Sequence, residues 1–183
     1  WVLEAGKQLG GLDVMVSNVG AMAQGIDRDS WLKNVNVDVF GLMDMIAAGQ
    51  EFLQAAGAKH GDAAVIAVGS AASTSAPAAS SYGAIKAAMV HFIKGYAKQN
   101  APRKIRANIV SPAAVYFDGG IWQNIEKHNP EMFKAAFARY PLGRMATPYE
   151  IANAVVFLAS PRSSFTTGIN LNIEGAVGDR VNF

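Results

Sequence analysis

Short runs of apolar residues alternate along the chain with longer segments in which apolar residues recur every three or four positions. Four runs predict strands: LDVMVSN (12–18), AAVIAVGS (63–70), IRANIVSP (105–112) and GINLNIEG (168–175). Strands that are apolar along their whole length are buried on both faces, which is typical of a parallel sheet with helices on each side. No repeat or linker interrupts the pattern, so we expect one α/β domain over residues 1–183.

The segments between these runs predict helices. The longest covers residues 29–56, with Asp29 or Ser30 as its N-cap and Gly57 at its end. The helix that opens at Thr147 has a capping-box pattern. The other helical segments cover residues 80–101 and residues 118–140, the latter divided at Asn129-Pro130.

Composition narrows the class of protein. The chain is 51% hydrophobic and 16% charged, which is typical of a compact globular domain. Its net charge of +2 comes from scattered basic residues, so we expect no nucleic-acid partner, and no apolar stretch is long enough for a membrane span. The start of the chain has no signal-peptide pattern, and the lack of cysteine excludes disulfides, which fits a cytoplasmic protein. Three widely separated histidines predict no metal site.

Tyr82 and Lys86 share one face of the predicted helix over residues 80–101. Side chains four positions apart lie one above the other on a helix. A phenol with its ordinary pKa of about 10 is a poor acid or base at neutral pH, but a nearby ammonium favours its ionised form. Such a pair suits proton transfer to or from an alcohol oxygen. The same spacing is also compatible with a half-buried tyrosine beside a solvated lysine.

Other polar residues come at the ends of the predicted strands. Ser70 ends the second strand, SNVG (17–20) ends the first, and VSPAAV (110–115) ends the third. Because ligands bind at the carboxyl ends of the strands in a doubly wound sheet, we expect these segments to surround one crevice. Asn36 adds an amide in an otherwise apolar helix.

These segments, in this order, resemble the short-chain dehydrogenase/reductase family over nearly the whole chain. SNVG is similar to the family's N-N-A-G motif, WLKNVNVDVFG to its asparagine-bearing helix, VGSAAS to its serine-bearing strand end and YGAIK to its Y-x-x-x-K motif. IRANIVSPAAV and TTGINLNIEGA resemble its R-x-N-x-[VI]-x-P-G and closing T-G-x-x-[LI]-x-V-D-G-G segments. The resemblance implies a Rossmann-like doubly wound parallel sheet, of which this chain would hold the C-terminal four strands with their flanking helices.

The resemblance also implies catalytic roles for four residues. Tyr82 would be the general acid/base, and Lys86 would bind the nicotinamide ribose hydroxyls and favour the ionised phenol. Ser70 would orient the carbonyl or alcohol, and Asn36 would hold a water that continues a proton relay to Lys86. Many members have the serine thirteen positions before the tyrosine, where this chain has Gly69, so Ser70 requires a one-residue deletion in the loop and Ser73 is the alternative.

Binding roles follow in the same way. The residues implied at the cofactor are Asn18, Gly20, Pro112 and Val115, together with Tyr82 and Lys86. In the segment that resembles the family's substrate lid, Phe117 and Trp122 would line an apolar or aromatic pocket for a small carbonyl or alcohol substrate, although such aromatic residues are also common in plain cores. Ala113 and Phe117 replace the family's usual glycine and threonine.

The family's glycine-rich turn, T-G-x-x-x-G-x-G, has no counterpart in the chain. At ~30 residues per βαβ unit, we expect an N-terminal truncation of roughly 70 to 80 residues. Two hypotheses therefore stand. The chain is an NAD- or NADP-dependent oxidoreductase that interconverts an alcohol and a ketone or aldehyde, or it is a non-catalytic remnant that folds and oligomerises without binding dinucleotide.

Two predictions concern assembly. By the same resemblance, helices 29–56 and 80–100 would pack against their twins in a homodimer or homotetramer, through apolar positions that include Met43, Ala47, Ala48, Ala87, Val90 and Ile93. The strand over residues 12–18 would form an edge of the sheet. Because it carries no lysine or proline to protect that edge, we expect another copy or the N-terminal segment to cover it.

Overall fold

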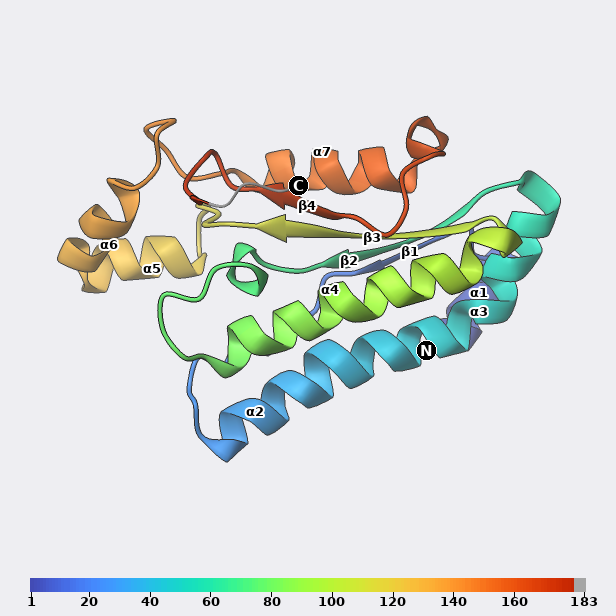
Figure 1. Cartoon of the computed structure of the whole chain (residues 1–183), viewed down its shortest axis with the longest axis horizontal. Helices are drawn as coiled ribbons and strands as arrows, with labels where there is room; N and C mark the ends of the chain where they lie inside the picture. The colour runs from blue at the N-terminus through green and yellow to red at the C-terminus, as the bar shows by residue number, and fades with distance from the viewer. Residues whose placement is uncertain (180–183) are drawn as a thin grey trace.

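A computed structural model describes residues 1–179, and it contains one parallel sheet of four strands (Figure 1). The strands are β1 (Val14–Ser17), β2 (Ala63–Val68), β3 (Ile105–Pro112) and β4 (Asn170–Ile173). They lie in the order β1-β2-β3-β4, and each pairs in parallel with the next. The four predicted strands and the parallel α/β class are confirmed.

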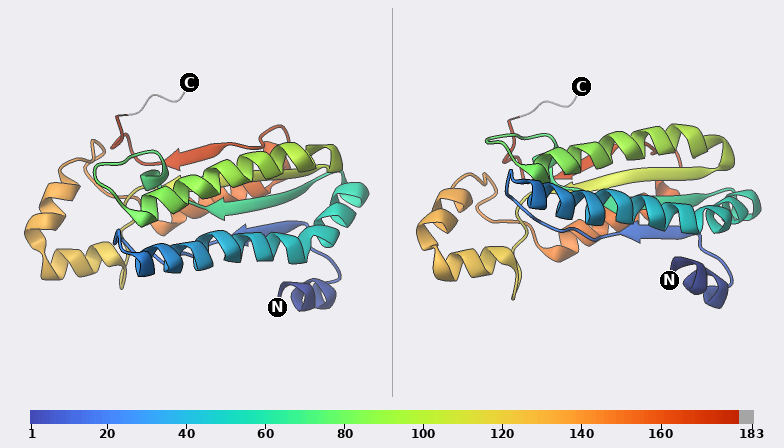
Figure 2. Two further views of the ribbon diagram at one scale, coloured as in Figure 1. Left: turned by 60° about the horizontal axis from the view of Figure 1, so that its bottom comes forward. Right: turned by 90° about the horizontal axis from the view of Figure 1, so that it is seen from below.

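Helices cover both faces of this sheet (Figures 1 and 2). The α-helices are α1 (Val2–Leu9), α2 (Arg28–Asn34), α3 (Gly41–His60), α4 (Ser81–Asn100), α5 (Ile121–His128), α6 (Pro130–Phe137) and α7 (Pro148–Ala159). A π-helical segment, η1 (Val35–Phe40), joins α2 to α3, and three 3-10 turns are η2 (Ala71–Ser73), η3 (Ala101–Arg103) and η4 (Pro161–Ser163). Helices α3 and α4 cover one face and α7 the other, whereas α5 and α6 lie beyond the carboxyl ends of the strands.

Strand β2 shows why the predicted strands are apolar throughout. Ala63, Val65 and Ala67 belong to the larger core under α3 and α4, and the alternating Ala64 and Ile66 belong to a smaller core under α7. Since successive side chains of a strand point to opposite faces, a strand covered on both sides needs apolar residues at every position. The two cores therefore account for the unbroken runs in the sequence.

The long helix predicted over residues 29–56 is present, but it begins and ends at other residues and a π-helical segment interrupts it. Its N-cap is Asp27, whose carboxylate accepts a hydrogen bond from the Ser30 N–H at 2.9 Å. It continues through Gly57 to His60, because a hydrogen in place of a side chain lets Gly57 lie against the Arg103 carbonyl; a Cβ there would stand 2.3 Å from that oxygen. The π turn of η1 is marked by the Gly41 N–H, which donates to the Asn36 carbonyl five residues back.

Strand β1 is an edge of the described sheet, as the sequence predicts. Val14 and Val16 remain 41% and 45% exposed, while Met15 is buried against α3. Helix α1 packs on α3 and lines with β1 a small apolar hollow of about 130 Å³. Whether another copy covers this edge stays a prediction.

Arg106 lies at the end of the sheet opposite to the predicted crevice. Its guanidinium forms an ion pair with Asp62, which precedes β2, at 2.8 Å. It also donates to the Leu158, Ala159 and Ser160 carbonyls and to the Ser163 hydroxyl. This one side chain therefore ties the start of β3 to the end of α7. In the part of the chain that the structure describes, no helix is both long and apolar enough to cross a membrane.

Candidate active site

The ammonium of Lys86 is buried at the carboxyl end of β2. It forms an ion pair of 2.7 Å with the Asp38 carboxylate, and the two side chains are only 4% and 1% exposed. It also donates a hydrogen bond of 3.3 Å to the Val68 carbonyl, the last residue of β2. Burial of a charged pair is costly unless its geometry is good and its members are hydrogen-bonded, so this pair marks a specific site.

Tyr82 lies on the same face of α4 as Lys86, as the four-residue spacing predicts. The Lys86 Nζ atom lies 5.6 Å from the centroid of the Tyr82 ring. Helix α4 begins at the Ser80 N-cap, so Tyr82 stands in its first turn, close to the strand ends. The phenol is therefore half-buried beside a fixed cation, which the alternative of a solvated lysine does not match.

The loop that follows β1 runs across this ion pair. The Ala21 N–H donates to the second oxygen of Asp38 at 3.0 Å. A Cβ added at Gly20 would stand 3.4 Å from the Asp38 carboxylate and 3.5 Å from the Lys86 Nζ atom, so the backbone passes in close contact with both. The structure thus brings Gly20 to Lys86, whereas Asn18 is exposed next to β1.

Two fully buried polar side chains hold this loop in place, and the sequence reasoning missed both. The Asn34 amide donates to the Ala23 carbonyl at 2.8 Å and to the Ser81 hydroxyl at 2.9 Å. The Ser81 hydroxyl in turn donates to the Gly25 carbonyl at 2.6 Å. Loop, helix α2 and the start of α4 are therefore fixed relative to one another, which keeps the approach to Tyr82 in one shape.

Ser70 follows β2 and faces the start of α4 through the η2 turn. Its hydroxyl oxygen accepts a hydrogen bond from the Ala72 N–H at 3.1 Å, which leaves the hydroxyl proton available to a ligand. The η2 turn packs closely on α4, since a Cβ at Gly83 would stand 3.1 Å from the Ala72 carbonyl. Ser73, the alternative serine, has a buried hydroxyl with no partner among the described residues.

Asn36 is the one predicted catalytic residue that the structure places elsewhere. It is exposed, whereas Asp38, two positions on, is buried against Lys86. Residues two apart on a helical segment point to different sides, so the two cannot share one role. The residue of this segment that lies at Lys86 is therefore Asp38, whereas the catalytic role of Asn36 stays a prediction. The signal in the sequence was a carboxylate between two valines, in VNVDVF.

Comparisons with known proteins identify the family. The family model described as enoyl-(acyl carrier protein) reductase matches residues 1–177. An isoepoxydon dehydrogenase of Penicillium expansum is 33% identical, and the match covers 97% of this chain and 68% of that dehydrogenase. The 3-oxoacyl-(acyl-carrier-protein) reductase FabG of Vibrio cholerae is 30% identical, and the match covers 93% of this chain and 68% of that reductase. A solved short-chain dehydrogenase/reductase oxidoreductase of Burkholderia thailandensis superposes with a TM-score of 0.84 at 27% identity, covering 96% of this chain and 68% of that one.

The chain belongs to the short-chain dehydrogenase/reductase family. The predicted resemblance is thereby confirmed, and so is the class of enzyme, an oxidoreductase. An NADH-dependent reductase responsible for alginate metabolism is a further structural neighbour, with a TM-score of 0.80 at 26% identity over 98% of this chain and 70% of that one. Its sheet and helices correspond to those of this short-chain dehydrogenase/reductase.

The end of β3 leads towards helices α5 and α6 of this short-chain dehydrogenase/reductase. Pro112 is the last residue of β3 and pairs with Ile173, and Val115 forms a parallel bridge with Ala146. Both predicted cofactor residues therefore stand at the carboxyl edge of the sheet, where Lys86 and Ser70 also lie. Among residues 1–179 no group of histidine or acidic side chains has an arrangement that could hold a metal ion.

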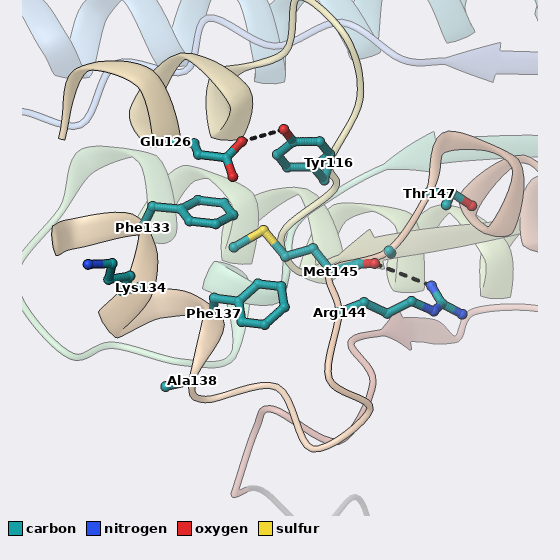
Figure 3. A pocket seen from close by; sticks show the side chains of 10 residues that line it. Tyr116, Glu126, Phe133, Lys134, Phe137, Ala138, Arg144, Met145 and Thr147 are labelled. Atoms are coloured by element: carbon teal, nitrogen blue, oxygen red, sulfur yellow. Dashed lines mark hydrogen bonds between the residues drawn. The ribbon is translucent and has the colours of Figure 1, made fainter. Parts of the chain in front are cut away.

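A pocket of about 580 Å³ lies under α5 and α6 (Figure 3). Its wall includes Phe133, Phe137 and Met145, and at one end the Tyr116 hydroxyl donates to the Glu126 carboxylate. That hydrogen bond raises the pKa of the Tyr116 phenol. This pocket is largely aromatic, but neither Phe117 nor Trp122 lines it and neither do Ser70, Tyr82 or Lys86.

Proposed function

We propose that this short-chain dehydrogenase/reductase is an NAD(P)-dependent oxidoreductase that interconverts an alcohol and a ketone or aldehyde. The observation that carries the proposal is the buried Lys86–Asp38 pair beside Tyr82, at the strand ends where a doubly wound sheet binds its ligands. Structural ion pairs do not require a phenol next to them. A phenol beside a fixed ammonium suits the transfer of a proton to a substrate oxygen.

Each residue has a separate task in this proposal. Tyr82 donates the proton to the carbonyl oxygen in reduction and removes it from the alcohol in oxidation. Ser70 donates its free hydroxyl hydrogen to the same oxygen and so orients it. Lys86 holds its ammonium beside the phenol, and an N–H of that ammonium would bind the cofactor ribose. A bound nicotinamide would supply or accept the hydride.

The residues around Lys86 fit the nicotinamide end of such a cofactor. Lys86 has three N–H hydrogens, of which one donates to the Val68 carbonyl, while its charge pairs with the Asp38 carboxylate. Gly20 keeps the loop close without a side chain, and Asn18, Pro112 and Val115 stand along the same edge. The choice between NAD and NADP stays open, because the chain has no glycine-rich turn and no residue assigned to the adenosine 2′ position.

Tyr82→Phe tests the function. It should lower carbonyl reduction at least about 100-fold, because general acid catalysis contributes that much or more. Tyr149→Phe is the matched control and should retain full activity, because the Tyr149 side chain is exposed in the first turn of α7. Isoepoxydon and 3-oxoacyl thioesters are the first substrates to assay, since they belong to the named relatives.

The non-catalytic alternative is not favoured by any described feature, and nucleotide binding separates it from the proposal. NADH and NADPH fluorescence should change on addition of the protein, and the change should weaken in Lys86→Ala. Two results together would support the non-catalytic alternative instead. The protein would bind neither nucleotide, and its oxidoreductase activity would be the same with and without the Tyr82 hydroxyl.

We also propose a homodimer or homotetramer through α3 and α4. Met43 and Ala47 are exposed on α3, and Ala87 and Val90 are partly exposed on α4, so these helices keep an apolar outer side. Ile93 does not belong to this surface, because it is buried against the sheet in the larger core. Light scattering at micromolar concentration measures the oligomeric state, and a strict monomer would contradict this proposal.

A further inference from the structure

Asp38 is a buried carboxylate with two different partners. One oxygen lies 2.7 Å from the Lys86 Nζ atom, and the other accepts the Ala21 N–H at 3.0 Å. Its side chain is 1% exposed, so both interactions are shielded from water. It sits in the π-helical segment η1, a kind of local distortion that is frequent at functional sites. An asparagine could hold the Ala21 N–H equally well, but it would carry no charge.

We propose that Asp38 is a positioning residue whose charge holds the Lys86 ammonium beside Tyr82 and offsets part of the effect of that ammonium on the phenol. This inference rests on the proposed roles of Tyr82 and Lys86. It gives the site a neutral ion pair next to the reacting phenol, in place of an isolated cation.

The surroundings leave few other charges to do this. From α4 the titratable groups at this point are Tyr82 and Lys86 themselves, and from η1 the group is Asp38. Strand β2 contributes the Val68 carbonyl, and the loop after β1 contributes the backbone of Gly20 and Ala21. These backbone groups carry no net charge, so removing the Asp38 charge should act directly on the other two residues.

Asp38→Asn, which keeps the shape, is the decisive variant. The Tyr82–Lys86 pair should release its first proton at a pH about one unit lower than in the parent protein, because an opposite charge within a few ångströms shifts a titration by that much or more. Carbon-13 NMR of labelled tyrosine, assigned with Tyr82→Phe, follows the phenol. Nitrogen-15 NMR of labelled lysine, assigned with Lys86→Met, follows the ammonium.

Asp44→Asn, at an exposed position of α3, is the matched control and should leave both titrations in place. If Asp38→Asn does not fold, the neutral variant Asp38→Ser gives the same test. An unchanged or higher first titration in a folded neutral variant would overturn the proposal and leave Asp38 as a loop anchor only. The titration uses neither substrate nor cofactor, so this outcome is separate from a failure of the proposed oxidoreductase function.

Discussion

Two ion pairs, Arg106–Asp62 and Lys86–Asp38, stand at opposite ends of strand β2 and differ in how fully their buried cations are hydrogen-bonded. Arg106 has five N–H hydrogens, and the described residues accept six hydrogen bonds from them. Lys86 has three; the described residues accept one hydrogen bond from it, at the Val68 carbonyl, and the Asp38 carboxylate pairs with its charge. The first cation is saturated by the fold, whereas the second keeps bonding capacity for something else.

From this difference we expect Arg106 mainly to stabilise the fold and Lys86 mainly to serve the proposed active site. Arg106 reaches three backbone carbonyls at the end of α7, and its loss would remove one donor from each, although the Leu158 and Ser160 carbonyls keep the Ser163 hydroxyl. Lys86 reaches one carbonyl and one carboxylate. Breaking each pair should therefore give a different result.

The largest expected effect is on Arg106. Arg106→Met should lower the free energy of unfolding by about 3–5 kcal/mol, because it leaves the Asp62 carboxylate without its cation and takes one donor from each of three α7 carbonyls. Urea unfolding measures the change, with the exposed Arg103→Met as a control of small effect. The double variant Arg106→Met/Asp62→Leu should stay destabilised, since the carbonyls have still lost the Arg106 N–H groups. Recovery to the parental midpoint would show that the ion pair alone mattered.

The order of strands and helices was predictable because each depends on local signals. Ser80 and Thr147 are N-caps as their types suggest, and Asn129-Pro130 divides α5 from α6. The predicted helix end at Gly57 is wrong because a glycine is suited both to a C-cap and to a close backbone contact. Here Gly57 makes the close contact, with the Arg103 carbonyl. The C-cap is Gly61, four residues later.

The fourth polar residue of the site was not predictable in the same way. Asn36 and Asp38 are both polar residues in one apolar segment, and the π turn between α2 and α3 changes which of them faces inward. The partner that decides is Lys86, which is distant in sequence. The Asn34–Ser81 contact escaped for the same reason. Sequence spacing predicted neighbours on one helix, but not contacts between helices.

An intermediate effect is expected at Lys86. Lys86→Met should cost about 3 kcal/mol of unfolding free energy, the low end of the range for a buried ion pair that loses one partner, because Asp38 keeps the Ala21 N–H. The double variant Lys86→Met/Asp38→Asn should recover most of that loss, since no charge then remains buried. Urea unfolding of the parent, the single variant and the double variant measures these changes, and a double variant no better than the single one would contradict the expectation.

The smallest effect is expected at a third pair, Arg144–Glu150, which is exposed at the start of α7. The Arg144 guanidinium, bonded to Glu150 at 2.7 and 2.8 Å, together with the Thr147 N–H lowers the pKa of the Glu150 carboxyl from 4.5 to about 2. A carboxyl whose pKa is lower in the folded than in the unfolded state stabilises the fold above the unfolded value. Its contribution should therefore be complete above about pH 4.5 and be lost as the pH falls towards 2. In urea unfolding, Glu150→Gln should lie below the parent at neutral pH and converge with it over that range. Glu131→Gln, from the more exposed pair with Lys134, should differ less from the parent at neutral pH, because solvent screens such pairs. A gap for Glu150→Gln that is the same at every pH would mean that the ionised carboxylate does not stabilise the helix start.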